Sequence, residues 1–167
     1  MERKPTVYVE TTIPSYLTSE PSRDLIVAAN QQLTHTWWKK AEEKYVFVTS
    51  ESVIDEASQG NPEMAVKRVA ILESLEILPL NDDVTELIEF YHRRLGLTGA
   101  AMRDLVHIAY SVAYNVECLA TWNCSHIANS QVITRLQRLN ESLGRATPMI
   151  ATPHVLAGLP AASGDEV

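Results

Sequence analysis

The sequence predicts an α/β protein: a three-layer α/β/α sandwich around a central parallel sheet of five strands. Short apolar segments typical of buried strands alternate along the chain with longer helical segments. The strand segments lack a polar face, as expected when helices cover both sides of a parallel sheet. The length of 167 residues suits one domain with a sizeable core. We therefore expect one domain over residues 1–157 and a small, polar, flexible tail over residues 158–167.

The composition is that of an ordinary globular protein. Hydrophobic residues make up 46% and charged residues 21%, and the formal net charge is -7. This charge argues against a large basic surface for nucleic acid, although an acidic chain can still meet phosphate through a bound cation. No apolar leader precedes the first strand, and no stretch approaches the roughly 20 apolar residues of a membrane span. We expect a cytoplasmic protein with no membrane contact.

Two cysteines, Cys118 and Cys124, are too few for a disulfide framework and are interpreted as buried free thiols. The predicted strands, in chain order, cover residues 6–10, 46–49, 76–80, 118–121 and 149–151. The predicted helices cover residues 24–44, 51–58, 64–74, 82–94, 101–114 and 126–143.

Local signals set several of these boundaries. Thr12 is a candidate N-cap for a short helix that contains Pro14, and Ser50 is a good N-cap for the helix that follows the second strand. Gly60, Asn61 and Pro62 break the next helical pattern, and residues 96–99 form a turn. Ser125 is a candidate cap for the last long helix. The helix over residues 101–114 is apolar almost all round, which predicts burial.

Polar side chains gather where the predicted strands end. Glu10 ends the first strand, Glu56 lies on the helix after the second, and Asn123 follows the fourth. Asp104 lies inside the apolar helix, where an ionised carboxylate is costly unless it is paired or binds a metal. Ligands of parallel sheets bind beyond the carboxyl ends of the strands, so three acids and an amide are expected to converge there. Such oxygen ligands suit Mg²⁺ or Mn²⁺.

Each of these acids also has a purely structural interpretation. Glu10 could be an acid at a helix start, favoured by the helix dipole. Asp104 could pair with Arg93, Arg94 or Arg103. Asp55 competes with Glu56 for the site and is interpreted as solvated.

The histidines and tryptophans near these acids have structural interpretations too. His107 and His126 are interpreted as satisfied structural residues rather than ligands. The side chains of Trp37, Trp38 and Trp122 could stack on bases, but packing in the core or at an interface is favoured for all three.

The whole set resembles the PIN domain family of metal-dependent ribonucleases, whose best-known small members are the VapC-type toxins of type II toxin–antitoxin pairs. The resemblance is carried by VYVETTIPSYL, SESVIDE, RDLVHIAY, LATWNCSHIAN and ATPHVL, in that order and over nearly the whole chain. It implies a hydrolase that cuts RNA phosphodiester bonds by metal-activated water, with Mg²⁺ or Mn²⁺ as the cofactor. It also implies an antitoxin that inserts a segment near the acidic site, and a homodimer.

The family's functional positions fall on Glu10, Glu56, Asp104 and Asn123, with Glu10 and Asp104 as metal ligands. The resemblance also suggests Thr11, Thr12 and Arg103 as contacts to the ion's waters or to substrate phosphates. Two positions depart from the family, which usually has Asp where Glu10 stands and often has Asp where Asn123 stands. These departures predict one well-held ion and a weak second one.

Two other functions stay open at this point. The departures at Glu10 and Asn123 favour a catalytically weakened PIN-like protein that acts as a binding module. A small phosphotransfer domain resembling response regulators also gathers acids at strand ends. The second alternative is disfavoured because no Lys follows a late strand and no acidic pair follows the first.

Overall fold

The computed structural model describes residues 3–123, 125 and 129–158. Five parallel strands form one sheet in the order β3-β2-β1-β4-β5. They are β1 (Thr6–Val9), β2 (Val46–Ser50), β3 (Glu76–Leu78), β4 (Cys118–Ala120) and β5 (Met149–Ala151). The predicted five-stranded parallel sheet is confirmed. Because every strand is parallel, all carboxyl ends lie along one edge.

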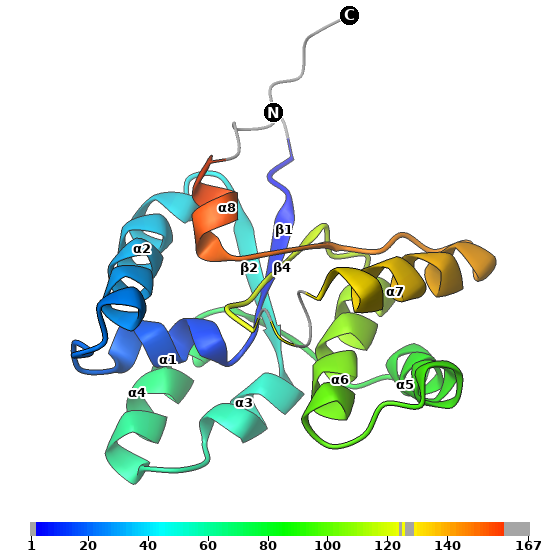
Figure 1. The fold of residues 1–167 in the computed structure, drawn as a ribbon, viewed down its shortest axis with the longest axis horizontal. Helices are drawn as coiled ribbons and strands as arrows, with labels where there is room; N and C mark the ends of the chain where they lie inside the picture. The colour runs from blue at the N-terminus through cyan, green and yellow to red at the C-terminus, as the bar shows by residue number, and fades with distance from the viewer. Residues whose placement is uncertain (1–2, 124, 126–128, 159–167) are drawn as a thin grey trace, which may run out of the picture.

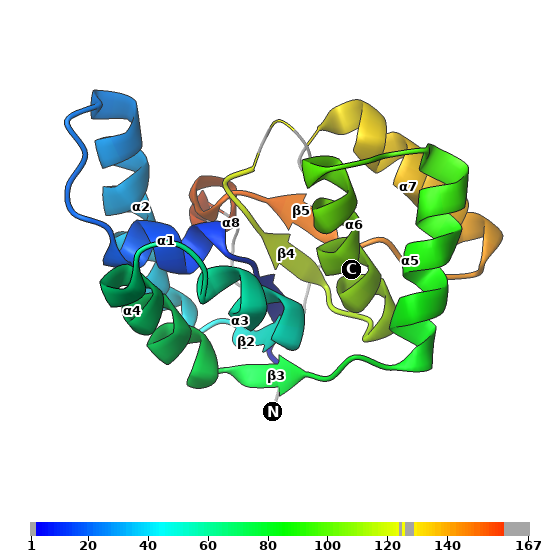
Figure 2. The ribbon, with the colours of Figure 1, turned by 90° about the horizontal axis from the view of Figure 1, so that it is seen from below.

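Helices cover both faces of this sheet (Figures 1 and 2). One side carries α1 (Thr12–Thr18), α2 (Leu25–Ala41) and α4 (Pro62–Glu73), and the other carries α5 (Asp82–Leu95), α6 (Ala100–Ala113) and α7 (Ser130–Ser142). The helix α3 (Glu51–Ala57) contacts both α4 and α6, and α8 (Pro153–Gly158) packs against α2. The predicted three layers are therefore present.

The chain reverses its direction across the sheet at β1. It winds outward from β1 to β2 and β3, and then crosses back to place β4 on the other side of β1. In open parallel sheets a crevice forms beyond the carboxyl ends of the strands at such a point. Glu10 follows β1, and Trp122 and Asn123 follow β4, so these residues lie beside the crevice.

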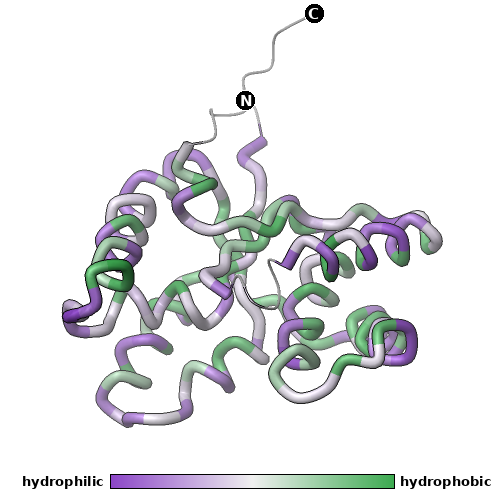
Figure 3. Tube along the Cα trace, viewed as in Figure 1, coloured by the Kyte–Doolittle hydropathy of each residue, from purple (hydrophilic) through white to green (hydrophobic). Residues whose placement is uncertain are grey.

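The core is built from the apolar strands and from α6. Figure 3 shows the apolar residues gathered along the central strands. Tyr8 and Leu119 are fully buried neighbours on β1 and β4, and five consecutive residues of α6, from Ile108 to Val112, are buried. The predicted burial of this helix is confirmed. Within the described residues, no helix combines the length and the apolar character needed to cross a bilayer.

Capping side chains explain most helix starts. Asp24, Ser50, Asn61 and Asn81 each accept hydrogen bonds from first-turn amides of their helices. The predicted start of the last long helix at residue 126 is wrong, because Asn129 accepts from Gln131 and Val132 and the helix begins at Ser130. Ser125 is therefore not its N-cap.

Other elements also differ from expectation. The strand predicted over residues 76–80 ends at Leu78, because Pro79 lacks the N–H that would continue the ladder. The first long helix ends at Ala41 rather than at residue 44. The short helix α8 had no predicted counterpart. Gly158 is its last residue, and the rest of the predicted tail lies outside the described residues.

The Leu119→Ala variant is expected to lose about 2–5 kcal/mol of unfolding free energy, because Leu119 is fully buried in β4 and its truncation leaves a cavity. Urea unfolding followed by circular dichroism measures the loss. The Leu25→Ala variant is the control, since Leu25 is 85% exposed, and it should unfold near the wild-type midpoint. Equal losses in the two variants would mean that Leu119 is not in the core.

Candidate active site

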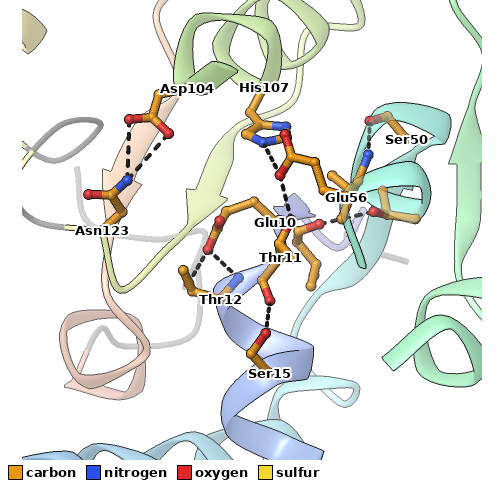
Figure 4. A network of polar contacts seen from close by, with 12 residues as sticks. Glu10, Thr11, Thr12, Ser15, Ser50, Glu56, Asp104, His107 and Asn123 are labelled. Atoms are coloured by element: carbon orange, nitrogen blue, oxygen red, sulfur yellow. Dashed lines mark hydrogen bonds and ion pairs between the residues drawn. The ribbon is translucent and has the colours of Figure 1, made fainter. Parts of the chain in front are cut away.

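The site lies at the carboxyl edge of the sheet. Glu10 leaves the end of β1, Glu56 comes from α3, Asp104 from α6 and Asn123 from the turn after β4. In the view of Figure 4, Glu10 lies between the pair Asp104–Asn123 on one side and the pair Glu56–His107 on the other. The predicted convergence of four distant segments is therefore observed.

Glu10 is a buried acid whose carboxylate is held by the start of α1. Its Oε1 accepts from the backbone N–H of Thr12 at 3.0 Å and from the Thr12 hydroxyl. The same hydroxyl accepts from the backbone N–H of Trp122 at 2.9 Å, which ties the end of β1 to the end of β4. The prediction that Thr12 caps this helix is wrong: no side-chain cap is present, and Glu10 satisfies the first-turn amide instead.

Burial makes the charge of Glu10 costly. Only 4% of the residue is exposed, and this desolvation raises its pKa from 4.5 to about 7. The nearby His107 and hydrogen bonds from Thr12 and Thr121 lower the pKa of Glu10 without offsetting this rise. Glu10 therefore accepts a hydrogen bond at the start of a helix, as its structural interpretation expects. It also has a strongly raised pKa, which is common among acids of functional sites.

Glu56 behaves differently from Glu10. Its Oε2 accepts from the Thr11 hydroxyl at 2.8 Å and lies 3.4 Å from Nε2 of His107. Partial burial alone would raise the pKa of Glu56, but His107, Thr11 and the charge of Arg103 together lower it below its ordinary value. Two acids in one site thus have pKa values displaced in opposite directions, a pattern found in sites that separate acid and base roles.

Asp104 is half-buried on α6 and meets Asn123. The Asn123 amide nitrogen donates to both carboxylate oxygens of Asp104, at 3.3 and 3.2 Å. The turn that carries Asn123 is fixed by the Thr121 hydroxyl, which accepts from the Asn123 backbone N–H at 2.9 Å. Of the arginines considered as partners for Asp104, Arg94 lies over the ring of Phe90 and Arg103 is exposed.

The suggested phosphate contacts have other roles in this structure. The hydroxyls of Thr11 and Thr12 donate to Glu56 and Glu10, so they orient the acids. Arg103 lies close enough to Glu56 to lower its pKa. Contact of these three residues with an RNA phosphate stays a prediction.

Sequence reasoning missed one member of the network. His107 is 2% exposed and reaches both Glu56 and, through Nδ1 at 3.0 Å, the hydroxyl of Tyr8. It was interpreted as a satisfied core residue, and it is one, but it also touches a predicted catalytic acid. Its spacing of three residues from Asp104 on one helix placed both on the same face and could have revealed the link.

The tryptophan side chains are packed against other residues. Trp38 stacks on Phe47, and Trp37 is buried against both rings. Trp122 donates from Nε1 to the Thr34 hydroxyl at 2.8 Å and contacts the ring of Tyr16. Packing, the interpretation favoured from the sequence, is what the structure contains for all three tryptophans.

Of the two cysteines, only Cys118 lies among the described residues. Cys118 is a buried free thiol, as predicted. The predictions for Cys124 and His126 lie outside the described residues.

The donor set suits a small hard cation of the Mg²⁺ type. Mg²⁺ commonly takes only one or two protein carboxylates and keeps several waters. Glu10 and Asp104 offer such carboxylates from two different segments at the carboxyl edge of the sheet. A cation beside Glu10 would also offset the cost of ionising a buried acid. Among residues 3–123, 125 and 129–158, no three His, Cys, Asp or Glu side chains gather closely enough to hold a metal by themselves. The oxygens present therefore fit a water-rich ion rather than a closed cage.

The fold is that of VapC-like PIN domains. No protein-family model matches the sequence, and no curated protein is detectably similar to it. Solved structures do match, and the resemblance to this class that the sequence predicted is confirmed at the level of the fold.

Three such structures illustrate the match. VapBC2 from Rickettsia felis, bound to a DNA fragment from its promoter, has a TM-score of 0.55 at 15% identity and covers 88% of this chain and 98% of its own. VapC20 of Mycobacterium tuberculosis, a toxin that cleaves the sarcin–ricin loop, has a TM-score of 0.57 at 17% identity and covers 74% and 95%. VapBC-1 from nontypeable Haemophilus influenzae has a TM-score of 0.55 at 15% identity and covers 89% and 98%.

Proposed function

We propose that this chain is a metal-dependent endoribonuclease, the toxin of a type II toxin–antitoxin pair. The observation that carries the proposal is the convergence of Glu10, Glu56 and Asp104 from three distant segments on the crevice where the strand order reverses. Similar folds belong to an RNA-cleaving toxin and to toxins solved as VapBC complexes, which supports RNA as substrate and an antitoxin as partner.

Glu10 and Asp104 would hold a Mg²⁺ or Mn²⁺ ion. When bound, such an ion activates water and offsets negative charge on a phosphate. Glu56 is kept ionised by its neighbours and offers an oxygen that can take a proton from an attacking water. The Asn123 amide holds Asp104 in place by donating to both of its carboxylate oxygens. Arg103, exposed beside Glu56, offers a cation for an RNA phosphate.

The Glu56→Gln variant is expected to lose RNA cleavage by about 100-fold or more, because Gln keeps the size of the side chain but cannot accept a proton. The measurement is cleavage of a structured RNA panel in Mn²⁺, with a parallel reaction in EDTA. The Asp55→Asn variant is the matched control, since Asp55 is the exposed neighbour on the same helix and should leave the rate unchanged.

A second candidate function is a PIN-like binding module without catalysis. It is favoured by the Asn123 amide, which occupies both oxygens of Asp104. Under that function, wild type, Glu56→Gln and Asp55→Asn would all fail to cleave any RNA, with and without Mn²⁺. Cleavage by wild type that disappears in Glu56→Gln would exclude it.

A further inference from the structure

A buried chain of polar groups runs behind Glu56 and ends on its carboxylate. The Ser50 hydroxyl lies 2.7 Å from the Tyr8 hydroxyl, which lies 3.0 Å from Nδ1 of His107. Nε2 of His107 lies 3.4 Å from Oε2 of Glu56, a contact that Figure 4 shows. Ser50 and Tyr8 are fully buried and His107 is 2% exposed. Buried polar groups must find partners, and each member of this chain finds the next one.

The direction of the hydrogen bonds follows from Glu56. An ionised carboxylate only accepts, so Nε2 of His107 must carry the proton that faces it. In the neutral ring Nδ1 then accepts from the Tyr8 hydroxyl, and Tyr8 accepts from Ser50. Ser50 in turn accepts from the backbone N–H of Val53, in the first turn of the helix that bears Glu56. This series of hydrogen bonds thus begins at Val53 and ends at Glu56, both on α3.

Both contacts to the Glu56 side chain meet the same oxygen. Thr11 approaches Oε2 from the segment after β1, and His107 approaches it from α6. Within the described residues, Oε1 forms no hydrogen bond. One oxygen is therefore anchored while the other stays available. The end of α3 is anchored as well, since the Arg68 guanidinium donates to the carbonyls of Ala57 at 3.0 Å and Gln59 at 2.6 Å.

From this geometry we infer that His107 is a positioning residue: it holds Oε2 and so fixes the rotamer of Glu56, which leaves Oε1 available to a water. The Tyr8–Ser50 pair fixes the ring of His107 in turn. A carboxylate that must act on a water gains from a single orientation, because misplacement by about 1 Å can cost about 100-fold in rate. The catalytic consequence of this role depends on the proposed nuclease function, whereas the contact itself does not.

The contact can be tested by proton NMR with ¹⁵N-histidine. The chain has five histidines, and His107→Gln assigns the signal of His107. Burial should make its Nε2–H signal slow to exchange with water. Glu56→Ala is expected to shift this signal and to speed its exchange, while Asp55→Ala leaves it unchanged. A His107 signal that does not respond to Glu56→Ala would overturn the inference, whatever the enzyme does.

The consequence for catalysis can be tested with two amides at position 107. Gln reaches about as far as Nε2 of the imidazole, whereas Asn reaches only as far as Nδ1. We expect His107→Asn to lower kcat by about 10- to 100-fold with KM for RNA unchanged, and His107→Gln to stay within about threefold of wild type. Thermal unfolding of both variants monitors the fold, and Tyr91→Phe controls for loss of a buried hydrogen bond far from the site.

The outcomes separate the two proposals. Equal loss of kcat in His107→Asn and His107→Gln, in proportion to lost stability, would overturn the positioning role. Wild-type kcat in His107→Asn would overturn it as well. A wild type that cleaves no RNA, but shows the His107 signal responding to Glu56→Ala, would overturn the nuclease function and support the contact.

Discussion

The Asp104→Ala variant is expected to lose saturable Mn²⁺ binding and to cleave RNA about 100-fold more slowly or not at all. Loss of an outer-shell partner of a metal already costs about 10- to 100-fold in affinity, and removal of a carboxylate ligand should cost at least as much. Asp104 stands out because it is the single acid of the largely apolar helix α6 and is held by the amide of Asn123. Calorimetric titration of Mn²⁺ into the purified protein measures the binding without any substrate.

Two controls make this titration decisive. Asp55→Ala removes an exposed carboxylate from the neighbouring helix and should bind Mn²⁺ like wild type, which excludes a general effect of charge. Urea unfolding of Asp104→Ala in EDTA should give a transition close to that of wild type, which excludes a folding defect. Saturable binding of equal affinity in wild type and Asp104→Ala would place the ion elsewhere. Absence of binding in a folded wild type would refute the metal-dependent function.

The fold could be predicted from the sequence because its signals are local. Strands such as Val7–Val9 and 118–120 are uniformly apolar, and caps such as Ser50 and Asn81 stand directly before helical patterns. Errors arose where a local signal was ambiguous. Ser125 was the cap expected for the last long helix, whereas the side chain of Asn129 accepts from the first-turn amides. The strand that begins at Glu76 ends at Leu78, before Pro79, whereas the apolar pattern of the sequence continues to Leu80.

That Glu10, Glu56, Asp104 and Asn123 lie at one edge of the sheet could also be predicted, because the carboxyl ends of parallel strands share one edge. The pairing inside the site could not. The sequence does not indicate that the Thr12 hydroxyl donates to Glu10 while the Thr11 hydroxyl donates to Glu56. It also does not indicate that His107 contacts both Glu56 and Tyr8. The contact between Thr12 and Glu10 spans two positions, whereas the contacts of Thr11 and Tyr8 join residues 45 and 99 positions apart. The long-range contacts depend on side-chain directions fixed by the packing of α3 and α6.

The Glu10→Gln variant is expected to remove a pH dependence of stability that the metal-free wild type should show. Burial raises the pKa of Glu10 from 4.5 to about 7, so between these values the folded state binds more protons than the unfolded state. Stability therefore falls as the pH rises through this window, and it is constant with respect to this group below and above it. At about 1.4 kcal/mol per pKa unit, the full effect is about 3 kcal/mol.

Gln suits this comparison because its amide oxygen can still accept from the Thr12 backbone N–H while its charge is absent. Urea unfolding in EDTA, repeated from pH 4.5 to pH 8, should give a wild-type curve that falls relative to the Glu10→Gln curve by about 3 kcal/mol. Glu56 has its pKa lowered and contributes the opposite slope, but it is present in both proteins and cancels in the difference. Glu89→Gln, which removes an exposed carboxyl from α5, should run parallel to wild type.

A cation should reverse the cost of the buried charge. If Glu10 holds Mn²⁺, adding the ion at pH 8 should stabilise wild type more than Glu10→Gln, and the stabilisation should shrink toward pH 5, where protons compete for the carboxylate. Parallel wild-type and Glu10→Gln curves in EDTA would show that Glu10 is hydrated in solution. If the stability curves of wild type and Glu10→Gln diverge in EDTA and Mn²⁺ does not change this difference, Glu10 acts only as the acid at the start of α1. The ion would then have to be bound by Asp104 and water.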